Sequence, residues 1–101
     1  MVGKDFDVAK NIKMTENLQC QMLAVLSDFF TAMQQNAPKV EKTEILASME
    51  VLLYLMAARL GISRAAMDRK AAANIKLGLL EEEQGEWKSA LLELLHELEQ
   101  A

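Results

Sequence analysis

Residues 45–61 read ILASMEVLLYLMAARLG, and this stretch decides the fold. Its apolar side chains recur at steps of three and four residues, the spacing that places them on one face of an α-helix. The two stripes are Ile45, Met49, Leu52 and Met56, and beside them Leu46, Leu53, Ala57 and Leu60. Gly61 follows where a left-handed cap would end the helix. The pattern predicts a helix over residues 39–60.

The second half of this helix is apolar almost all the way round. Val51, Tyr54 and Leu55 fall outside the two stripes, and Met56 completes the apolar turn. A helix of this kind must be covered on every side, and a chain of 101 residues has few other helices to do so. We therefore expect a homodimer. The candidate interaction surface consists of Val51, Tyr54, Leu55 and Met56.

The rest of the chain extends the helical pattern in both directions. Thr15 is a good N-cap for a helix over residues 16–35, and Ser63 for one over residues 64–83. Gln84 and Gly85 indicate a turn before a last helix that starts at Glu86. Residues 1–14 show alternation and are interpreted as an extended N-terminal arm. The fold class is all-α: residues 15–101 form a single domain, a compact dimeric bundle of about four helices.

Composition favours a soluble, cytoplasmic chain. Apolar residues make up 51% of it, yet the longest apolar run, residues 51–58, is far shorter than the roughly 18 residues of a membrane helix. Five charged residues among the first 13 exclude a secretory signal there. Cys20 is the single cysteine, so it can form no internal disulfide and is interpreted as a packing residue.

Residues suited to catalysis are scarce. His96 follows Glu93 at the spacing used by di-iron helix bundles, but the sequence has no second histidine to complete such a site. Glu44 and Glu50 are six residues apart, which does not bring them onto one face, and no Gly-rich phosphate loop is present. We expect no catalytic residues, no metal, no cofactor and no enzymatic activity.

The basic charge is concentrated between Arg59 and Lys76, where the net charge is +4, whereas residues 81–101 carry −6. The start of the basic stretch, residues 57–70, reads AARLGISRAAMDRK. It resembles the helix-turn-helix of Fis-type DNA-binding domains, which have paired alanines, a Leu-Gly-Ile turn and a Ser-Arg start to the second helix. The resemblance implies that phosphates or base edges are contacted by Ser63, Arg64, Arg69 and Lys70.

Two functions follow from these patterns. The first is a small helical protein–protein interaction module, a regulator, adaptor or chaperone, which acts as a homodimer and offers a methionine-rich surface to itself or to another protein. The alternative is a helix-turn-helix DNA-binding regulator that uses residues 57–76. An enzyme is the third and most distant option, and no membrane partner is expected.

Overall fold

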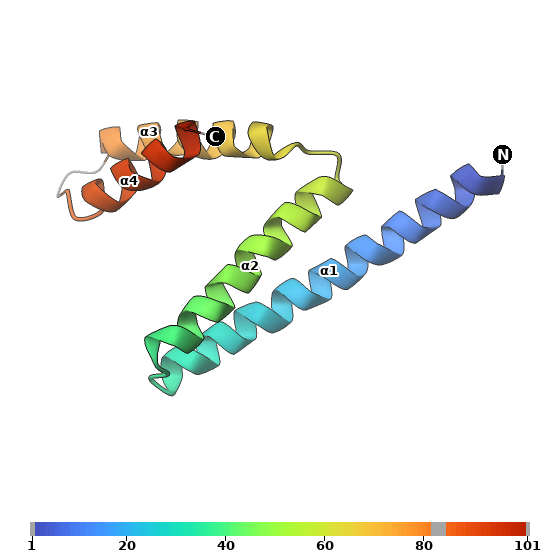
Figure 1. The fold of residues 1–101 in the computed structure, drawn as a ribbon, viewed down its shortest axis with the longest axis horizontal. Helices are drawn as coiled ribbons and strands as arrows, with labels where there is room; N and C mark the ends of the chain where they lie inside the picture. Colours follow the sequence, from blue (N-terminus) through green and yellow to red (C-terminus); the bar gives the residue numbers. More distant parts are fainter. Residues whose placement is uncertain (1, 82–84, 101) are drawn as a thin grey trace. The chain divides into compact units, whose positions relative to one another are not determined.

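Helices make up nearly all of the part of the chain that the structure describes. The computed structural model describes residues 2–81 and 85–100, with side chains from residue 8 onward. Its four helices are α1 (Val2–Gln34), α2 (Lys39–Arg59), α3 (Arg64–Glu81) and α4 (Lys88–Glu99) (Figure 1). The prediction of an all-α fold with about four helices is confirmed. α2 ends one residue before its predicted end and α3 begins at its predicted first residue, whereas α4 begins at Lys88 and not at Glu86. The predicted end of α3 at residue 83 and the turn residue Gln84 lie outside the described residues.

The first helix begins much earlier than predicted. α1 starts at Val2, so the backbone of residues 2–14 is helical and not extended. Thr15 does not cap a helix, because its Oγ1 donates a hydrogen bond of 2.8 Å to the carbonyl of Asn11 one turn earlier. A threonine inside a helix can satisfy its hydroxyl in this way, and residues 4–34 contain neither Gly nor Pro to interrupt α1.

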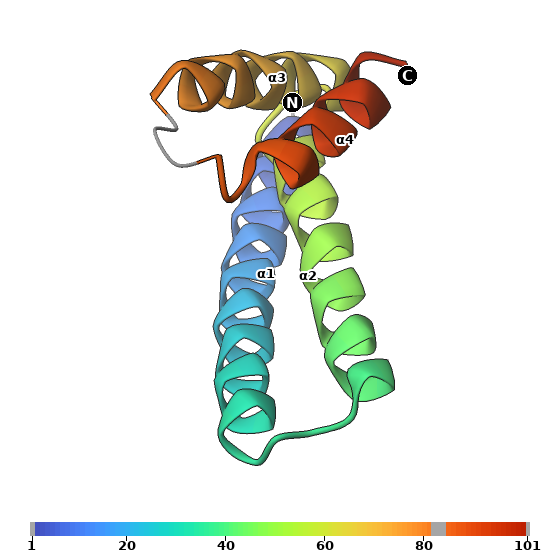
Figure 2. The ribbon, with the colours of Figure 1, turned by 90° about the vertical axis from the view of Figure 1, so that its left-hand side faces the viewer.

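A tight four-residue turn joins α1 to α2. Asn36 takes the left-handed conformation (φ 53°), and the amide of Ala37 bonds back to the carbonyl of Ala32 at 2.9 Å. The amide of Asn36 bonds to the carbonyl of Met33 at 3.2 Å. This pair of bonds is a Schellman motif, which satisfies the last carbonyls of α1. Pro38 then serves as the N-cap of α2, and the two helices run antiparallel (Figure 2).

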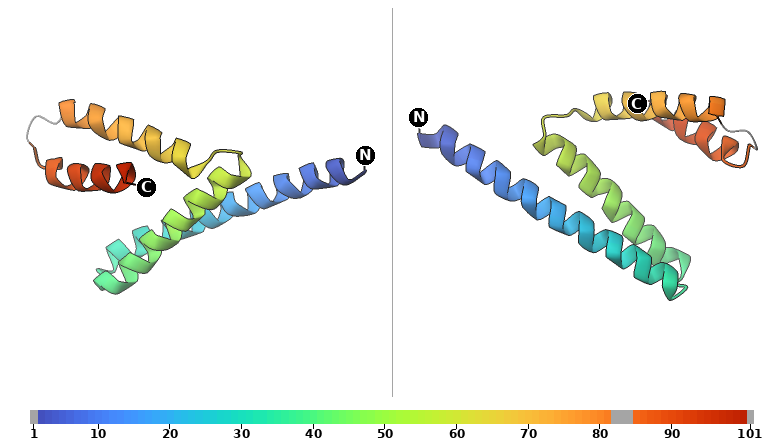
Figure 3. Two further views of the ribbon diagram at one scale, coloured as in Figure 1. Left: turned by 45° about the horizontal axis from the view of Figure 1, so that its top comes forward. Right: turned by 180° about the vertical axis from the view of Figure 1, so that it is seen from behind.

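The chain divides into two compact units, residues 1–61 and residues 62–101. In the first, α1 packs against α2, and in the second α3 packs against α4 (Figure 3). The predicted division into an arm of residues 1–14 and a domain of residues 15–101 stays a prediction. Few side chains are buried in either unit. Among the described residues, the buried apolar ones are Ala32, Leu52, Ala57, Ala72 and Ile75.

The contact between α1 and α2 uses the predicted stripes. Leu18, Met22, Val25 and Phe29 on α1 are half-buried, as are Ile45, Met49 and Met56 on α2. At the far end of the pair, the side-chain amide of Asn11 donates to the carbonyl of Arg59 at 3.4 Å, and the Arg59 guanidinium donates to Asn11 Oδ1 at 3.5 Å. These bonds join the third turn of α1 to the end of α2.

Within residues 2–81 and 85–100, no single helix is long and apolar enough to cross a membrane. α2 and α3 meet the combined criteria of length, hydropathy and charge only when they are joined as one segment.

Alanine substitutions at two glycines should change the free energy of unfolding in opposite directions. Gly61 has a φ of +75° and Gly78 lies inside α3, and in both cases an added Cβ meets no atom within 4 Å. Gly61→Ala should lower the free energy of unfolding by about 1 kcal/mol because the left-handed conformation is strained for alanine. Gly78→Ala should raise it by about 0.5–1 kcal/mol because alanine favours the helix. Urea unfolding monitored by circular dichroism measures both, and a stabilised Gly61→Ala would contradict the cap.

Candidate functional site

A groove in the second unit is lined by three of the four basic side chains of α3. It has a volume of about 670 Å³ and lies between α3 and the end of α4. Small side chains line part of it, namely Ala65, Ala72 and Ala73, and the cationic ones are Arg64, Arg69 and Lys76. Asp68, Leu98 and Glu99 complete the lining. Because alanine side chains are short, they leave space along α3 that the three cationic side chains border. We call these residues the basic groove.

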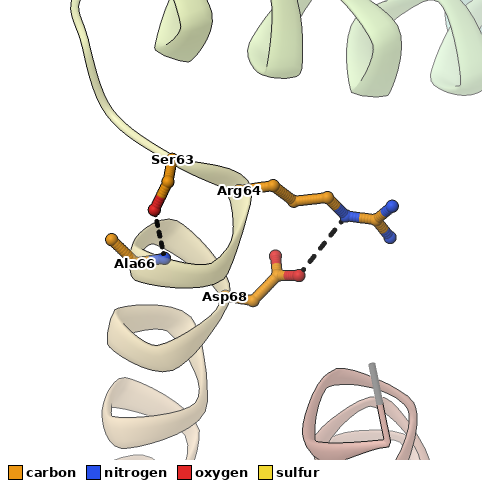
Figure 4. Close-up of polar contacts among 4 residues, drawn as sticks. All are labelled: Ser63, Arg64, Ala66 and Asp68. Atoms are coloured by element: carbon orange, nitrogen blue, oxygen red, sulfur yellow. Dashed lines mark hydrogen bonds and ion pairs between the residues drawn. The ribbon is translucent and has the colours of Figure 1, made fainter.

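Two of the three cations in the basic groove have acidic partners. The Arg64 Nε atom lies 3.4 Å from Asp68 Oδ2, one turn further along α3 (Figure 4). The carboxylate of Asp68 is buried, and this ion pair offsets the unfavourable desolvation of its charge. Lys76 Nζ lies 3.0 Å from Glu99 Oε2, which links α3 to the last residue of α4. No carboxylate among the described residues pairs with Arg69, so its charge is available to an anion.

The first turn of α3 is capped as the sequence predicts. The Ser63 hydroxyl accepts a hydrogen bond of 3.1 Å from the backbone amide of Ala66 (Figure 4). This bond satisfies one of the amides that a helix leaves free at its N-terminus. The Ser63 oxygen therefore has a structural role.

A second hollow, in the first unit, is acidic. It has a volume of about 310 Å³, and three carboxylates line it: Asp28 from α1, and Glu41 and Glu44 from α2. Thr31 and Gln35 add further polar groups. We call this the acidic hollow. In the described part of the chain, no three His, Cys, Asp or Glu side chains are close enough together to form a metal cage.

Sequence reasoning missed the acidic hollow. Glu41 and Glu44 are three residues apart and share a face of α2, whereas the pair considered from the sequence was Glu44 and Glu50. The spacing from Glu41 to Glu44 was a usable signal. The participation of Asp28 depends on how α1 and α2 pack, which the spacing along the chain does not reveal.

The four residues of the predicted interaction surface do not share one side of α2. Val51 and Leu55 are exposed and line a shallow groove with Gln21 of α1. Met56 is half-buried and belongs to the stripe that contacts α1, and Tyr54 is half-buried as well. Their role in self-association stays a prediction.

The residues assigned to DNA contact also have separate surroundings. Ser63 caps α3, Arg64 pairs with Asp68, and Arg69 borders the basic groove. Lys70 is exposed and does not line the groove. Each helix of the predicted motif packs against another element, α2 against α1 and α3 against α4.

The fold defines a class of small all-helical domains built from two antiparallel helix pairs, with an acidic hollow in one pair and a basic groove in the other. The chain belongs to the MazG-like family, whose model matches residues 8–92 and so covers parts of all four helices. Comparison with curated proteins and with solved structures gives no significant match.

Family membership corrects three predictions. Residues 57–70 are part of a MazG-like domain and not of a Fis-type helix-turn-helix; the shared alanines, glycine and serine suit any tight junction between helices. The regulator, adaptor or chaperone and the DNA-binding alternative are both wrong, because the family comprises nucleoside triphosphate pyrophosphohydrolase-like helical domains. The expectation that the chain is not an enzyme is contradicted on the same ground.

The cap at Ser63 can be tested directly. Ser63→Ala should lower the free energy of unfolding by about 1 kcal/mol because the amide of Ala66 loses its side-chain partner. Ser63→Asp should retain most of the stability, since aspartate caps equally well and its charge suits the helix dipole. Thermal and urea unfolding measure the difference. Equal stability of the alanine variant and the parent protein would remove the structural role given to Ser63.

Proposed function

We propose that this chain hydrolyses nucleoside triphosphates to nucleoside monophosphates and pyrophosphate. The observation that carries the proposal is the MazG-like family match over residues 8–92, which spans most of both units. In the reaction, a water oxygen attacks the α-phosphorus and the bond from that phosphorus to the bridging oxygen breaks. Pyrophosphate leaves, and the proton of the water passes to solvent. We expect the protein to act in the cytoplasm.

This chemistry needs no nucleophilic side chain. Phosphoryl transfer depends mainly on positioning the phosphates and on stabilising their negative charge. A nucleoside triphosphate carries several charges along a chain of phosphates, and arginine binds phosphate oxygens through two parallel hydrogen bonds. In the basic groove, Arg69 is the side chain with no acidic partner among the described residues. Within the second unit, the proposal assigns Arg69 to a phosphate group, with Arg64 and Lys76 beside it.

Hydrolysis of phosphoanhydrides commonly uses magnesium, and within the first unit the carboxylates of the acidic hollow are the candidate ligands for such an ion. Magnesium usually keeps several waters and is held by one or two carboxylates together with substrate phosphates. The absence of a three-donor cage among the described residues is consistent with this mode. At most two of Asp28, Glu41 and Glu44 would hold the ion, which when bound neutralises phosphate charge.

The activity is tested on the full chain with the common ribonucleoside and deoxyribonucleoside triphosphates, each with magnesium or manganese. Pyrophosphate and the nucleoside monophosphate should appear in equal amounts. Release of inorganic phosphate with a nucleoside diphosphate would place the cleavage at another bond and contradict the proposal. Failure to release pyrophosphate from every nucleotide would overturn it.

Arg69→Ala should raise KM about tenfold or more, because a hydrogen bond between an arginine and a charged oxygen contributes roughly 1.5–3 kcal/mol. Lys70→Ala is the matched control: it removes one positive charge from the neighbouring position of α3, outside the groove, and should leave KM nearly unchanged. Steady-state kinetics of pyrophosphate release measure both variants. Equal effects of the two substitutions would mean that charge alone, and not the groove, binds the nucleotide.

Glu44→Gln should lower kcat/KM and raise the magnesium concentration needed for half-maximal rate, because it removes a carboxylate from the acidic hollow. Glu50→Gln is its control, since Glu50 lies six residues further along α2 and does not line that hollow. Magnesium titrations at fixed nucleotide concentration separate the two variants. A normal magnesium dependence in Glu44→Gln would remove the acidic hollow from the site.

A further inference from the structure

One buried carboxylate lines the basic groove and is not among the side chains assigned to phosphate. Asp68 is 7% exposed, and among the described residues it is the one buried polar or charged residue. Its side chain lines the groove together with the three cations. A buried carboxylate is unfavourable unless hydrogen bonds or an opposite charge compensate for its lost hydration. Each carboxylate oxygen of Asp68 therefore needs a partner.

The protein supplies a partner for one of the two oxygens. Asp68 Oδ2 lies 3.4 Å from Arg64 Nε (Figure 4). No donor among residues 2–81 and 85–100 bonds to the other oxygen, Oδ1. Within these residues no side-chain oxygen or nitrogen is both fully buried and without a partner, so Oδ1 keeps access to the groove. This atom can accept a hydrogen bond from a molecule that enters there.

The groove has its acid deep and two of its cations near the surface. Arg64, Asp68, Ala72 and Lys76 follow one another at steps of four residues along α3, and all of them line the groove. The side chains of Arg64 and Lys76 are 69% and 59% exposed, whereas that of Asp68 is 9% exposed. A ligand whose phosphates meet the exposed cations thus presents another of its groups to the buried carboxylate.

The charge of the groove selects the kind of group that Asp68 binds. Three cationic side chains line the groove, against the two carboxylates of Asp68 and Glu99. A metal ion or an ammonium group beside Asp68 would be repelled by the cations around it. A carboxylate accepts hydrogen bonds, and a hydroxyl donates one without adding positive charge. The ligand that fits carries phosphate at one end and hydroxyl groups close by, as a phosphorylated sugar does.

The closeness of Asp68 to Arg69 favours the sugar of a nucleotide over its base. The two residues are neighbours on α3, and consecutive α-carbons are about 3.8 Å apart. In a nucleotide the ribose lies between the phosphates and the base, so its hydroxyls are the neutral donors nearest to the phosphates. A phosphate bound to Arg69 therefore leaves the ribose beside Asp68. The groove volume of about 670 Å³ lies within the roughly 300–1,000 Å³ of small-molecule sites.

We propose that Asp68 binds the ribose of the nucleotide, with its Oδ1 atom accepting hydrogen bonds from the vicinal 2′- and 3′-hydroxyls. The inference rests on the nucleotide binding of the proposed function, because Arg69 places the phosphate. Asp68 has no role in bond cleavage and determines specificity. A nucleotide without these hydroxyls leaves Oδ1 unpaired in the occupied groove, and an unpaired buried acceptor is unfavourable. The groove therefore prefers ribonucleotides.

Isothermal titration calorimetry of the full chain, with EDTA to prevent metal-dependent hydrolysis, measures binding by itself. The parent protein should bind a ribonucleoside triphosphate about tenfold more tightly than its 2′,3′-dideoxy counterpart, the effect of a hydrogen bond to a charged group. Asp68→Asn should abolish this preference by raising the Kd of the ribonucleotide about tenfold. Glu97→Gln is the matched control, because it removes an exposed carboxylate of α4 outside the groove and should keep the preference. Equal binding of both nucleotides by the parent protein overturns the proposal.

Inorganic tripolyphosphate separates the hydrogen bond from the general effect of charge. It offers phosphates without a sugar, and Asp68→Asn removes a negative charge, so the Kd of tripolyphosphate should not rise. The Kd of the ribonucleotide should rise in the same variant. An equal rise for both ligands would show a disturbed groove and overturn the proposal.

Asp68→Ala supplies a second variant, because alanine favours the helix and leaves no acceptor. It should bind ribonucleotide and dideoxynucleotide equally, with circular dichroism showing unchanged helicity. A ribonucleotide preference that survives both substitutions overturns the proposal. Pyrophosphate release without any sugar preference overturns it and leaves the proposed function intact, whereas sugar-selective binding without hydrolysis does the reverse. Failure to bind any nucleotide overturns both.

Discussion

The packing of α1 on α2 through one stripe of side chains determines which surfaces of the first unit stay exposed. A helix in contact with a single neighbour covers only one arc of its surface, and the remainder must be polar or must find another partner. In α1 the two remaining sides have opposite character, with Asp28 and Thr31 on one and Leu23 and Phe30 on the other. The single contact stripe thus separates a side suited to cations from a side suited to apolar partners.

The second unit relies on small residues in a comparable way. α3 carries Ala65, Ala72 and Ala73 where it borders the groove, and their short side chains leave room beside α4. The two ion pairs then orient the long side chains around that space. Asp68 restrains Arg64 from within α3, and Glu99 restrains Lys76 from α4. The groove therefore depends on the small size of the alanine side chains as well as on the charged side chains around it.

Local sequence signals predicted much of the fold. Gly61 and Ser63 marked the end of α2 and the start of α3 because their effects on a helix end depend only on neighbouring residues. The prediction at Thr15 was wrong because a threonine hydroxyl can either cap the N-terminus of a helix or donate to a carbonyl one turn earlier inside a helix. Which of the two occurs depends on whether the preceding residues are helical. Asp28 could not be placed beside Glu41 and Glu44 from spacing alone, since their proximity depends on the packing of two helices. The scarcity of His and Cys was a poor criterion for enzymatic activity, because phosphoanhydride hydrolysis by water requires neither.

The short turn from Gln35 to Pro38 also affects the order in which the molecule is built. Helices joined by four residues make contacts close together in sequence, and such contacts form quickly, within microseconds to milliseconds in small helical proteins. Residues 62–101 follow both helices in the chain, and segments made first can fold first during synthesis. The α1–α2 pair can therefore form while the second unit is still being made.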